Sequence, residues 1–503
     1  MSFAKNTITN YCGRFYIIVF GIMFLPLYLK YLGAAAFGLI SIYAVMHAWL
    51  SLLDMGLTST LSREVSYYYT QENGSLKIKE LLHSLEIIFL VINLMIIFGV
   101  SLSSSWIAHH WLQVENLSYS EVTFCIVLIG FMISFRWFAD VYRAGISGME
   151  QQAWLNGVSI VLTTLQYGGA YILLRWVTRT PSHFFEYQLL IAAIEPIFLG
   201  IKFYKISPTA PNHIIHFKIS WNMIKKVSPF ASSFFYVGII WVLLSQSDKL
   251  ILSHLLPLTT YGYFALVTVI SSGILQLAAP ISMALLPKMT CLLSQEKSGE
   301  MLRLYRHATQ LIAAIVLPIS GIMAIFGTEI IYVWTGNRIA ANWGGPILFW
   351  YALGNGFLSL SAFQYYLQFA YGNLKLHVIF NTVFALITFP LILFSAYHYG
   401  ALGTGITWFL MQTTAFFIWP PVVHHKYAPG IHREWIIKDI LPIFSVVLVT
   451  LFCLKKLPIN FELMNRDESF IILVGLTIFA CMLSASVSNS CRNFIADCFK
   501  GRI

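Results

Sequence analysis

The stretch SLEIIFLVINLMIIFGVSLSSS, residues 84–105, decides the fold. It is apolar almost throughout and long enough to cross the hydrocarbon core of a bilayer as a helix, which takes about 20 residues. Similar runs recur along the whole chain, and core helices of soluble proteins are shorter and more often interrupted by charge. The sequence therefore predicts about fourteen transmembrane helices. They are expected at residues 15–32, 37–57, 84–105, 121–142, 154–175, 184–204, 229–254, 260–286, 308–327, 344–370, 376–396, 400–423, 437–454 and 468–487.

The composition supports an all-α polytopic membrane protein with no soluble domain. The chain has 503 residues, of which 58% are hydrophobic and only 10% are charged, and its mean hydropathy is +0.73. Soluble domains carry about 25% charged residues, so most of this chain is not expected to face water. The 7 cysteines are scattered through apolar runs and the basic tail, which indicates neither a disulfide framework nor a zinc site.

The basic residues predict which loops face the cytoplasm. With the N-terminus placed inside, about three times as many Lys and Arg residues fall in inside segments as in outside segments. This bias predicts a multi-pass protein with both termini in the cytoplasm. The net charge of +10 is explained by the same bias and not by nucleic-acid binding.

The loops and motifs argue against an enzyme. The longest predicted loops, residues 106–120 outside and 205–228 inside, are too short for a catalytic domain. The sequence contains no phosphate-binding G-x-x-x-x-G-K-[ST] motif and no HExxH, GxSxG or kinase signature. No catalytic residue, metal site or cofactor is predicted, and H⁺ or Na⁺ is the candidate coupling ion for a transporter.

An internal duplication is indicated by an offset of 224 residues, which aligns Phe37-Gly38 with Tyr261-Gly262, Gly148 with Gly372 and Pro196 with Pro420. Six spans per copy predict two parallel lobes around a central cavity, related by an axis along the membrane normal. The expected parts are an N-lobe at 1–205, a cytoplasmic linker at 206–228, a C-lobe at 229–425, and two further helices with a basic cytoplasmic tail at 426–503.

Three stretches resemble a known family. PLYLKYLGAAAFGLISIYAVM (residues 26–46) and LLDMGLTSTLSRE (52–64) resemble the opening of bacterial O-antigen and polysaccharide flippases of the Wzx type. LLSQSDKLILSHLLPLTTYGYFAL (243–266) resembles the seventh and eighth helices of the same family. These proteins belong to the multidrug/oligosaccharidyl-lipid/polysaccharide (MOP) exporter superfamily. The resemblance implies transfer of undecaprenyl-diphosphate-linked oligosaccharides to the outer leaflet.

Cations within the spans are the predicted binding groups for such a substrate. A diphosphate crosses hydrocarbon only when cations meet it, and arginine suits bidentate phosphate contacts. Arg136, in the fourth span, is the leading candidate, with Arg143 and Lys249 as further cavity cations. The alternative for Arg136 is a neutralised charge ladder with Asp140 and Arg143 along one helix face. The alternative for Lys249 is an extended side chain reaching outer headgroups.

Acidic residues near these cations are candidates for coupling or gating. Glu195 precedes Pro196 in the sixth span and is a candidate proton carrier, or else a neutral group bonded to a carbonyl freed by the proline. Asp248 and Asp140 are expected to orient their basic neighbours. Asp54, with Arg63 beyond it, is expected to form a cytoplasmic gate or a structural pair.

Five aromatic residues are hypotheses for stacking against sugars. Two of them lie near Arg136, namely Trp137 and Tyr142, and the others are Trp241, Tyr365 and Tyr366. The histidine pairs at 109–110 and 424–425 are expected to lie in solvated loops.

The predicted function is a flippase for an O-antigen or similar repeat unit, working by alternating access through a cationic cavity in lipopolysaccharide biosynthesis. Its partners would be the polyprenyl-diphosphate-linked oligosaccharide, membrane lipids, and a polysaccharide polymerase and chain-length regulator. One alternative is a MATE-type drug/cation antiporter, which would centre on an acidic site. The other is a polytopic glycan polymerase or ligase, which would need a larger outer loop.

Overall fold

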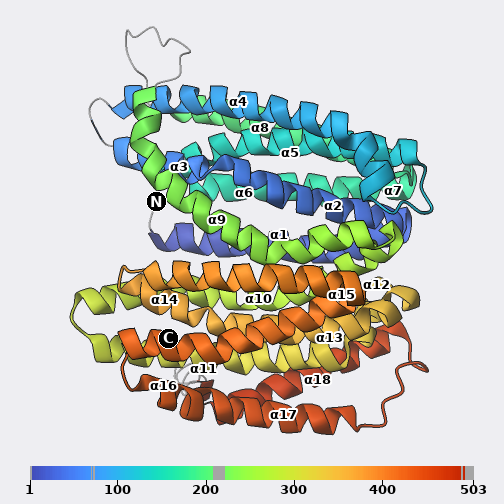
Figure 1. Cartoon of the computed structure of the whole chain (residues 1–503), viewed down its shortest axis with the longest axis vertical. Helices are drawn as coiled ribbons and strands as arrows, with labels where there is room; N and C mark the ends of the chain where they lie inside the picture. The colour runs from blue at the N-terminus through green and yellow to red at the C-terminus, as the bar shows by residue number, and fades with distance from the viewer. Residues whose placement is uncertain (1–2, 70, 72–73, 208–220, 489–490, 493–503) are drawn as a thin grey trace. The chain divides into compact units, whose positions relative to one another are not determined.

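The computed structural model describes residues 3–69, 71, 74–207, 221–488 and 491–492 (Figure 1). The described residues form helices, and the one β-type contact among them is an isolated bridge between Gln113 and Pro257. The predicted all-α fold class is therefore confirmed. The chain divides into two compact units, unit 1 (Met1–Gly262) and unit 2 (Tyr263–Ile503), which are described separately.

The helices of unit 1 are α1 (Phe3–Leu32), α2 (Ala34–Leu50), η1 (Ser51–Asp54), α3 (Leu57–Tyr68), α4 (Gly74–Trp106), η2 (Ile107–Trp111), α5 (Tyr119–Gly148), α6 (Gln152–Thr163), η3 (Thr164–Gly169), α7 (Ala170–Trp176), α8 (Pro181–Ile206) and α9 (Trp221–Leu255). The next helix, α10 (Leu258–Ser294), begins in unit 1 and continues into unit 2.

The helices of unit 2 are α11 (Ser298–Ile325), α12 (Gly327–Thr335), α13 (Arg338–Ser361), α14 (Phe363–Ala370), α15 (Lys375–Tyr427), α16 (Ile431–Glu434), η4 (Trp435–Ile440), α17 (Leu441–Lys455) and α18 (Arg466–Val487).

Within the described residues, 12 helical stretches are long and apolar enough to cross a membrane. Each overlaps a predicted span, so a multi-pass membrane protein is established. The predicted span at 184–204 coincides with α8, which is not among the 12. The predicted spans 376–396 and 400–423 both fall in α15, where Gly400 has a non-helical backbone (φ 59°, ψ −147°). The count of fourteen stays a prediction.

Local chemistry explains where several helices start. Ser118 accepts a hydrogen bond from the backbone N–H of Glu121 and so caps α5. Asn465 and Glu468 form a reciprocal capping box at the start of α18. Pro181 occupies the first turn of α8, where a missing N–H costs nothing. These caps satisfy backbone groups that the helix itself leaves without partners.

In unit 1, α5 packs against α8, α4 and α3. Glycines allow the close contacts: a Cβ at Gly148 would lie 2.6 Å from the carbonyl oxygen of Ser62, and one at Gly145 would overlap the Phe203 ring. These close contacts hold α5 tightly against α3, through Gly148, and against α8, through Gly145.

The starts of α2 and α10 make a reciprocal contact that follows the predicted duplication. A Cβ at Gly38 would lie 2.5 Å from the carbonyl oxygen of Leu258, and a Cβ at Gly262 would lie 2.1 Å from that of Ala34. Both pairs of positions are related by the same offset that aligns the Phe-Gly and Tyr-Gly dipeptides. The duplication itself stays a prediction. The predicted lobe boundaries stay a prediction, because the linker falls largely on residues 208–220, which lie outside the described residues.

In unit 2, the hairpin of α17 and α18 packs against α11 (Figure 1). Near the start of α18, the Arg466 guanidinium donates hydrogen bonds of 2.6 Å to the carbonyls of Val333 and Trp334, which end α12. At the other end, the Ser488 hydroxyl bonds to Gln310 of α11 at 3.3 Å. The helix α18 is thus tied to α12 at its start and to α11 at its end.

Candidate functional site

Unit 1 holds an ionic cluster of Arg136, Asp140 and Arg143 from α5 with Glu195 from α8. The guanidinium of Arg143 pairs with Glu195 in a short contact, and its Nε lies 3.4 Å from Asp140 Oδ1. It also donates a 3.1 Å hydrogen bond to Ser159 of α6. Arg143 therefore joins three helices, and its charge is balanced by two carboxylates.

Arg136, two turns earlier on α5, has no such balance. No carboxylate of the described residues lies within ion-pair distance of it, and its buried Nε has no hydrogen-bond partner. Its guanidinium carbon lies 5.6 Å from the centre of the Tyr43 ring on α2, in a cation–π contact. Asp140 and Arg143 pair with each other, as the alternative of a neutralised charge ladder predicts. Arg136 does not take part in this pairing, and its Nε donor has no partner.

Asp54 and Arg63 lie near one another in sequence but have separate roles in the fold. Both carboxylate oxygens of Asp54 accept bonds from Thr58, one from its backbone N–H at 3.1 Å and one from its hydroxyl at 3.0 Å. Asp54 therefore stabilises the start of α3. Arg63 lies further along α3 and pairs with Glu64 at 3.1 Å. Their predicted part in gating stays a prediction.

Asp248 and Lys249 pair with each other on α9, where Lys249 Nζ lies 3.5 Å from Asp248 Oδ1. The same ammonium donates to the carbonyl oxygen of Ser245 one turn earlier. The side chain of Asp248 is buried and that of Lys249 is about one quarter exposed (24%). Unlike Arg136, this cation has partners on its own helix.

The predicted stacking residues have different environments. Trp137 is buried and packs against Phe89 of α4, with ring centres 5.6 Å apart. Trp241 on α9 is exposed, whereas Tyr365 and Tyr366 are half-buried on α14 with their rings in contact. Sugar stacking by these residues stays a prediction.

Another buried carboxylate, that of Glu86 on α4, is not among the residues predicted from the sequence. One of its oxygens accepts hydrogen bonds from Tyr142 at 2.8 Å and Tyr204 at 2.7 Å, and the other lies 2.8 Å from His83 Nδ1. The signal was available, because Glu86 is the one charged residue of the stretch at 84–105. Tyr142, a predicted stacking residue, is therefore a hydrogen-bond donor to this carboxylate.

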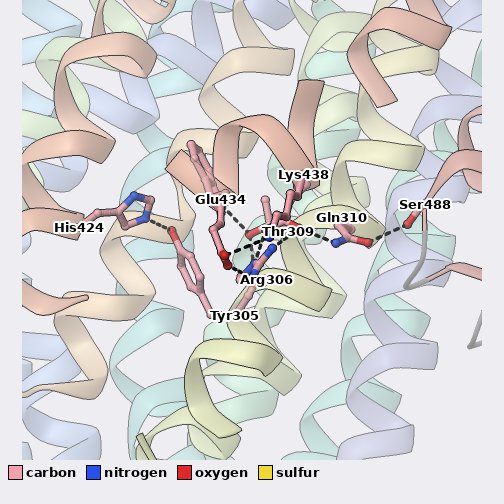
Figure 2. A network of polar contacts seen from close by, with 10 residues as sticks. Tyr305, Arg306, Thr309, Gln310, His424, Glu434, Lys438 and Ser488 are labelled. Carbon is pink, nitrogen blue, oxygen red and sulfur yellow. Dashed lines mark hydrogen bonds and ion pairs between the residues drawn. The ribbon is translucent and has the colours of Figure 1, made fainter. Parts of the chain in front are cut away.

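Unit 2 holds a polar network at the junction between α11 and the C-terminal helices (Figure 2). Arg306 makes a bidentate pair with Asp439, at 2.6 and 3.0 Å, and a 2.6 Å pair with Glu434. Gln310 donates to the same Asp439 at 2.6 Å, and Lys438 pairs with Glu434 at 3.0 Å. Asp439 lies in the π-helical segment η4, which turns its buried carboxylate toward α11.

The prediction of solvated histidine pairs is wrong for His424. Residues 109–110 are exposed in η2, but His424 is fully buried in α15, where its Nε2 lies 2.8 Å from the Tyr305 hydroxyl. No local pattern marks this residue as buried, because α15 extends past the predicted end of its span. Among the described residues, no group of three or more His, Cys, Asp or Glu side chains could hold a metal ion.

A known protein family resembles this chain in sequence, and solved structures resemble it in fold. A family model described as "polysaccharide biosynthesis protein" matches residues 3–293. No curated protein matches the chain. Among solved structures, the lipid II flippase MurJ in an inward closed conformation has a TM-score of 0.70 and 15% identity, covering 96% of this chain and 98% of that one.

Two multidrug transporters share the same fold. An inward-facing MATE family transporter of the MOP superfamily has a TM-score of 0.62 and 12% identity, covering 82% of this chain and 95% of that one. The MATE multidrug transporter DinF-BH, solved as a complex, has a TM-score of 0.58 and 14% identity, covering 84% and 95% respectively. The implied MOP fold is thus confirmed, and the chain belongs to the polysaccharide biosynthesis protein family.

Proposed function

We propose that this protein is a flippase that moves a polyprenyl-diphosphate-linked oligosaccharide, such as an O-antigen repeat unit, from the cytoplasmic to the outer leaflet. The family and the fold support a transporter of lipid-linked material. The observation that carries the proposal is Arg136, a cation within an apolar span that has no carboxylate partner among the described residues.

An unpaired guanidinium within a membrane-spanning helix is expensive, and proteins keep such groups where a ligand or a water-filled pathway meets them. A diphosphate supplies what Arg136 lacks, namely negative charge and several acceptor oxygens in a geometry that suits bidentate contact. The adjacent Tyr43 ring leaves the polar edge of the guanidinium available to such a ligand. The polyprenyl tail would stay in the lipid, where its transfer requires no polar partner.

The ionic cluster also contains the ion pair between Arg143 and Glu195. Their pair is half-buried, with 34% of the Arg143 side chain and 12% of the Glu195 side chain exposed. A diphosphate bound at Arg136 would compete with Glu195 for Arg143, and protonation of Glu195 would favour that exchange. Glu195 thus remains the proposed proton-coupling residue of unit 1, and Lys249 a further contact for the substrate.

The test is translocation by Arg136→Ala, with Arg179→Ala as a matched control. Arg179 also lies over a tyrosine ring, that of Tyr31 at 5.5 Å, but it belongs to a loop outside the candidate spans. In cells lacking the protein, lipid-linked repeat units should accumulate on the inner leaflet. The control variant should restore surface glycan and Arg136→Ala should not, at equal membrane levels. Normal surface glycan with Arg136→Ala would contradict the cationic site.

A drug/cation antiporter is a second candidate, favoured by the carboxylate of Asp140. Its side chain is 44% exposed and interacts with a single arginine at 3.4 Å, so it could accept an organic cation. The two functions differ in a direct measurement. The antiporter function predicts that Asp140→Asn abolishes cation efflux from vesicles, whereas the flippase function predicts no cation efflux by the wild-type protein.

The location follows from the same proposal. We propose the cell inner membrane, with both termini in the cytoplasm and with a polysaccharide polymerase and chain-length regulator as partners. Reporter fusions at the two termini test the orientation, and activity of a periplasmic reporter at either terminus would contradict it.

A further inference from the structure

A chain of four polar side chains in unit 2 has no part in the proposed substrate site. Gln364 Nε2 donates to the Tyr305 hydroxyl at 3.1 Å, that hydroxyl lies 2.8 Å from His424 Nε2, and His424 Nδ1 lies 3.1 Å from His432 Nδ1. The chain links α14, α11, α15 and α16. Gln364, Tyr305 and His424 are fully buried, whereas His432 is half-buried. Figure 2 shows His424 and Tyr305 facing each other beside the Arg306 network.

We propose that this chain is a proton-binding site that takes up one proton at His432 and transmits the change to α14. The contact between the two Nδ1 atoms carries the argument. Two neutral imidazoles can share that contact only if one Nδ1 donates and the other accepts. A protonated His432 carries a proton on both ring nitrogens, so its Nδ1 must donate to His424.

That requirement reverses donor and acceptor in each hydrogen bond from His432 to Gln364. With His432 neutral, His424 can donate from Nδ1 and accept the Tyr305 O–H at Nε2, while Tyr305 accepts from Gln364, so every contact is satisfied. With His432 protonated, His424 must carry its proton on Nε2 and donate to the Tyr305 oxygen. The Tyr305 hydroxyl then needs a new acceptor. The two states differ by one proton, which resides on His432, and His424 changes tautomer.

The acceptor for the reversed chain is present on α14. Gln364 Oε1 is buried without a hydrogen-bond partner, so rotation of the amide would present it to the Tyr305 hydroxyl. One turn later, Gln368 Oε1 is likewise buried and without a partner, while its Nε2 donates to the backbone carbonyl of Gln364. Unpaired buried acceptors are unusual in proteins, and here they lie where the reversed orientation needs one.

The ionic network beside the histidine pair is balanced in charge. The titratable and charged groups on the elements around the histidine pair are Tyr305 and Arg306 of α11, His425, Lys426 and Tyr427 of α15, Arg433 and Glu434 of α16, and Lys438 and Asp439 of η4. Four of them neutralise one another, because Arg306 and Lys438 pair with Asp439 and Glu434. The Trp435 ring packs against both imidazoles, with centres 5.1 and 6.2 Å away, and holds the pair in place.

The test uses the full-length protein in lipid nanodiscs with ¹⁵N-labelled imidazole rings, since ¹⁵N shifts distinguish the tautomers. Between about pH 5 and 8, where histidines titrate, His432 should protonate and His424 should change from the Nδ1–H to the Nε2–H tautomer in the same step. His432→Gln should abolish the change at His424, and His425→Gln should not, because His425 is an exposed neighbour outside the chain. A His424 tautomer that stays constant while His432 protonates overturns the proposal, as does a His432 that does not titrate in this range.

Its role as a coupling site rests on the proposed function and needs a separate measurement. In proteoliposomes with an imposed pH gradient, the ratio of translocation rates with and without the gradient should fall to one in Tyr305→Phe and stay at the wild-type value in His425→Gln. A ratio unaffected by Tyr305→Phe contradicts the coupling role. Absence of any translocation by the wild-type protein contradicts the proposed function, while the tautomer measurement still decides the proton site.

Discussion

Arg306 in unit 2 and Arg136 in unit 1 are both arginines in apolar helices, but their surroundings differ. Arg306 meets the two oxygens of a fully buried carboxylate and a further carboxylate at the start of the C-terminal hairpin. Arg136 meets a tyrosine ring and no carboxylate of the described residues. A compensated cation holds helices together, whereas an uncompensated one is available to a ligand. The comparison separates structural charge from candidate functional charge.

The largest expected effect is a loss of stability in Asp439→Asn, which changes a partner of the compensated Arg306. This change removes the negative charge and leaves Arg306 with one exposed partner, which costs about 3–5 kcal/mol when one member of a buried pair is lost. The midpoint of thermal unfolding in detergent should fall sharply. Asp467→Asn, an exposed carboxylate in the first turn of α18, is the control. Equal midpoints for the two variants would mean that the network does not fix the hairpin.

The opposite result is expected for Arg136→Ala. Because the guanidinium has no carboxylate partner to leave unpaired, the unfolding midpoint should stay close to the wild-type value. Translocation should fall by on the order of 30-fold, since loss of a desolvated charge contact costs about 2 kcal/mol or more. Arg136→Lys should recover only part of the rate, because lysine cannot make a bidentate contact. A destabilised Arg136→Ala with normal transport would reverse the comparison.

An intermediate loss of stability is expected for Arg143→Gln, because Arg143 is a compensated arginine in the same cluster as Arg136. Glu195 would lose its partner inside unit 1, at a cost of about 1–2 kcal/mol because the pair is partly exposed. Adding Glu195→Gln should restore most of that stability, and a double-mutant cycle measured by thermal unfolding gives the coupling. Additive effects of the two changes would show that the pair contributes no coupling energy.

The smallest effect is expected for Lys438→Ala. Its ammonium pairs with Glu434 at 3.0 Å one turn away, but the lysine side chain is 64% exposed, and exposed pairs contribute little. The unfolding midpoint should agree with the wild type within the scatter of repeated measurements. A drop comparable to that of Asp439→Asn would mean that the whole network acts as one unit.

The candidate site was found from the sequence only in part. Arg136 was identifiable because a charge in an apolar run is conspicuous, and Arg143 because it follows Arg136 and Asp140 at helical spacing. Glu195 was identifiable because it precedes a proline within a span. Their pairing was not, since Arg143 reaches Glu195 of α8 and Arg136 reaches no carboxylate of the described residues. The Arg306 network was missed for a related reason. Arg306 lies just before the predicted span at 308–327, where positive-inside counting treats a basic residue as a loop charge.

The sequence alone determined that this chain is a helical membrane protein of the polysaccharide biosynthesis family. Apolar length is a local property, because water is absent from the bilayer and each spanning segment must satisfy its own backbone as a helix. The partners of each charge depend on helices far apart in the chain, and only the tertiary structure decided them. Glu86 with its two tyrosines, the buried His424 and the unpaired Nε of Arg136 result from packing, because ion pairs and hydrogen bonds act over a few ångströms in space.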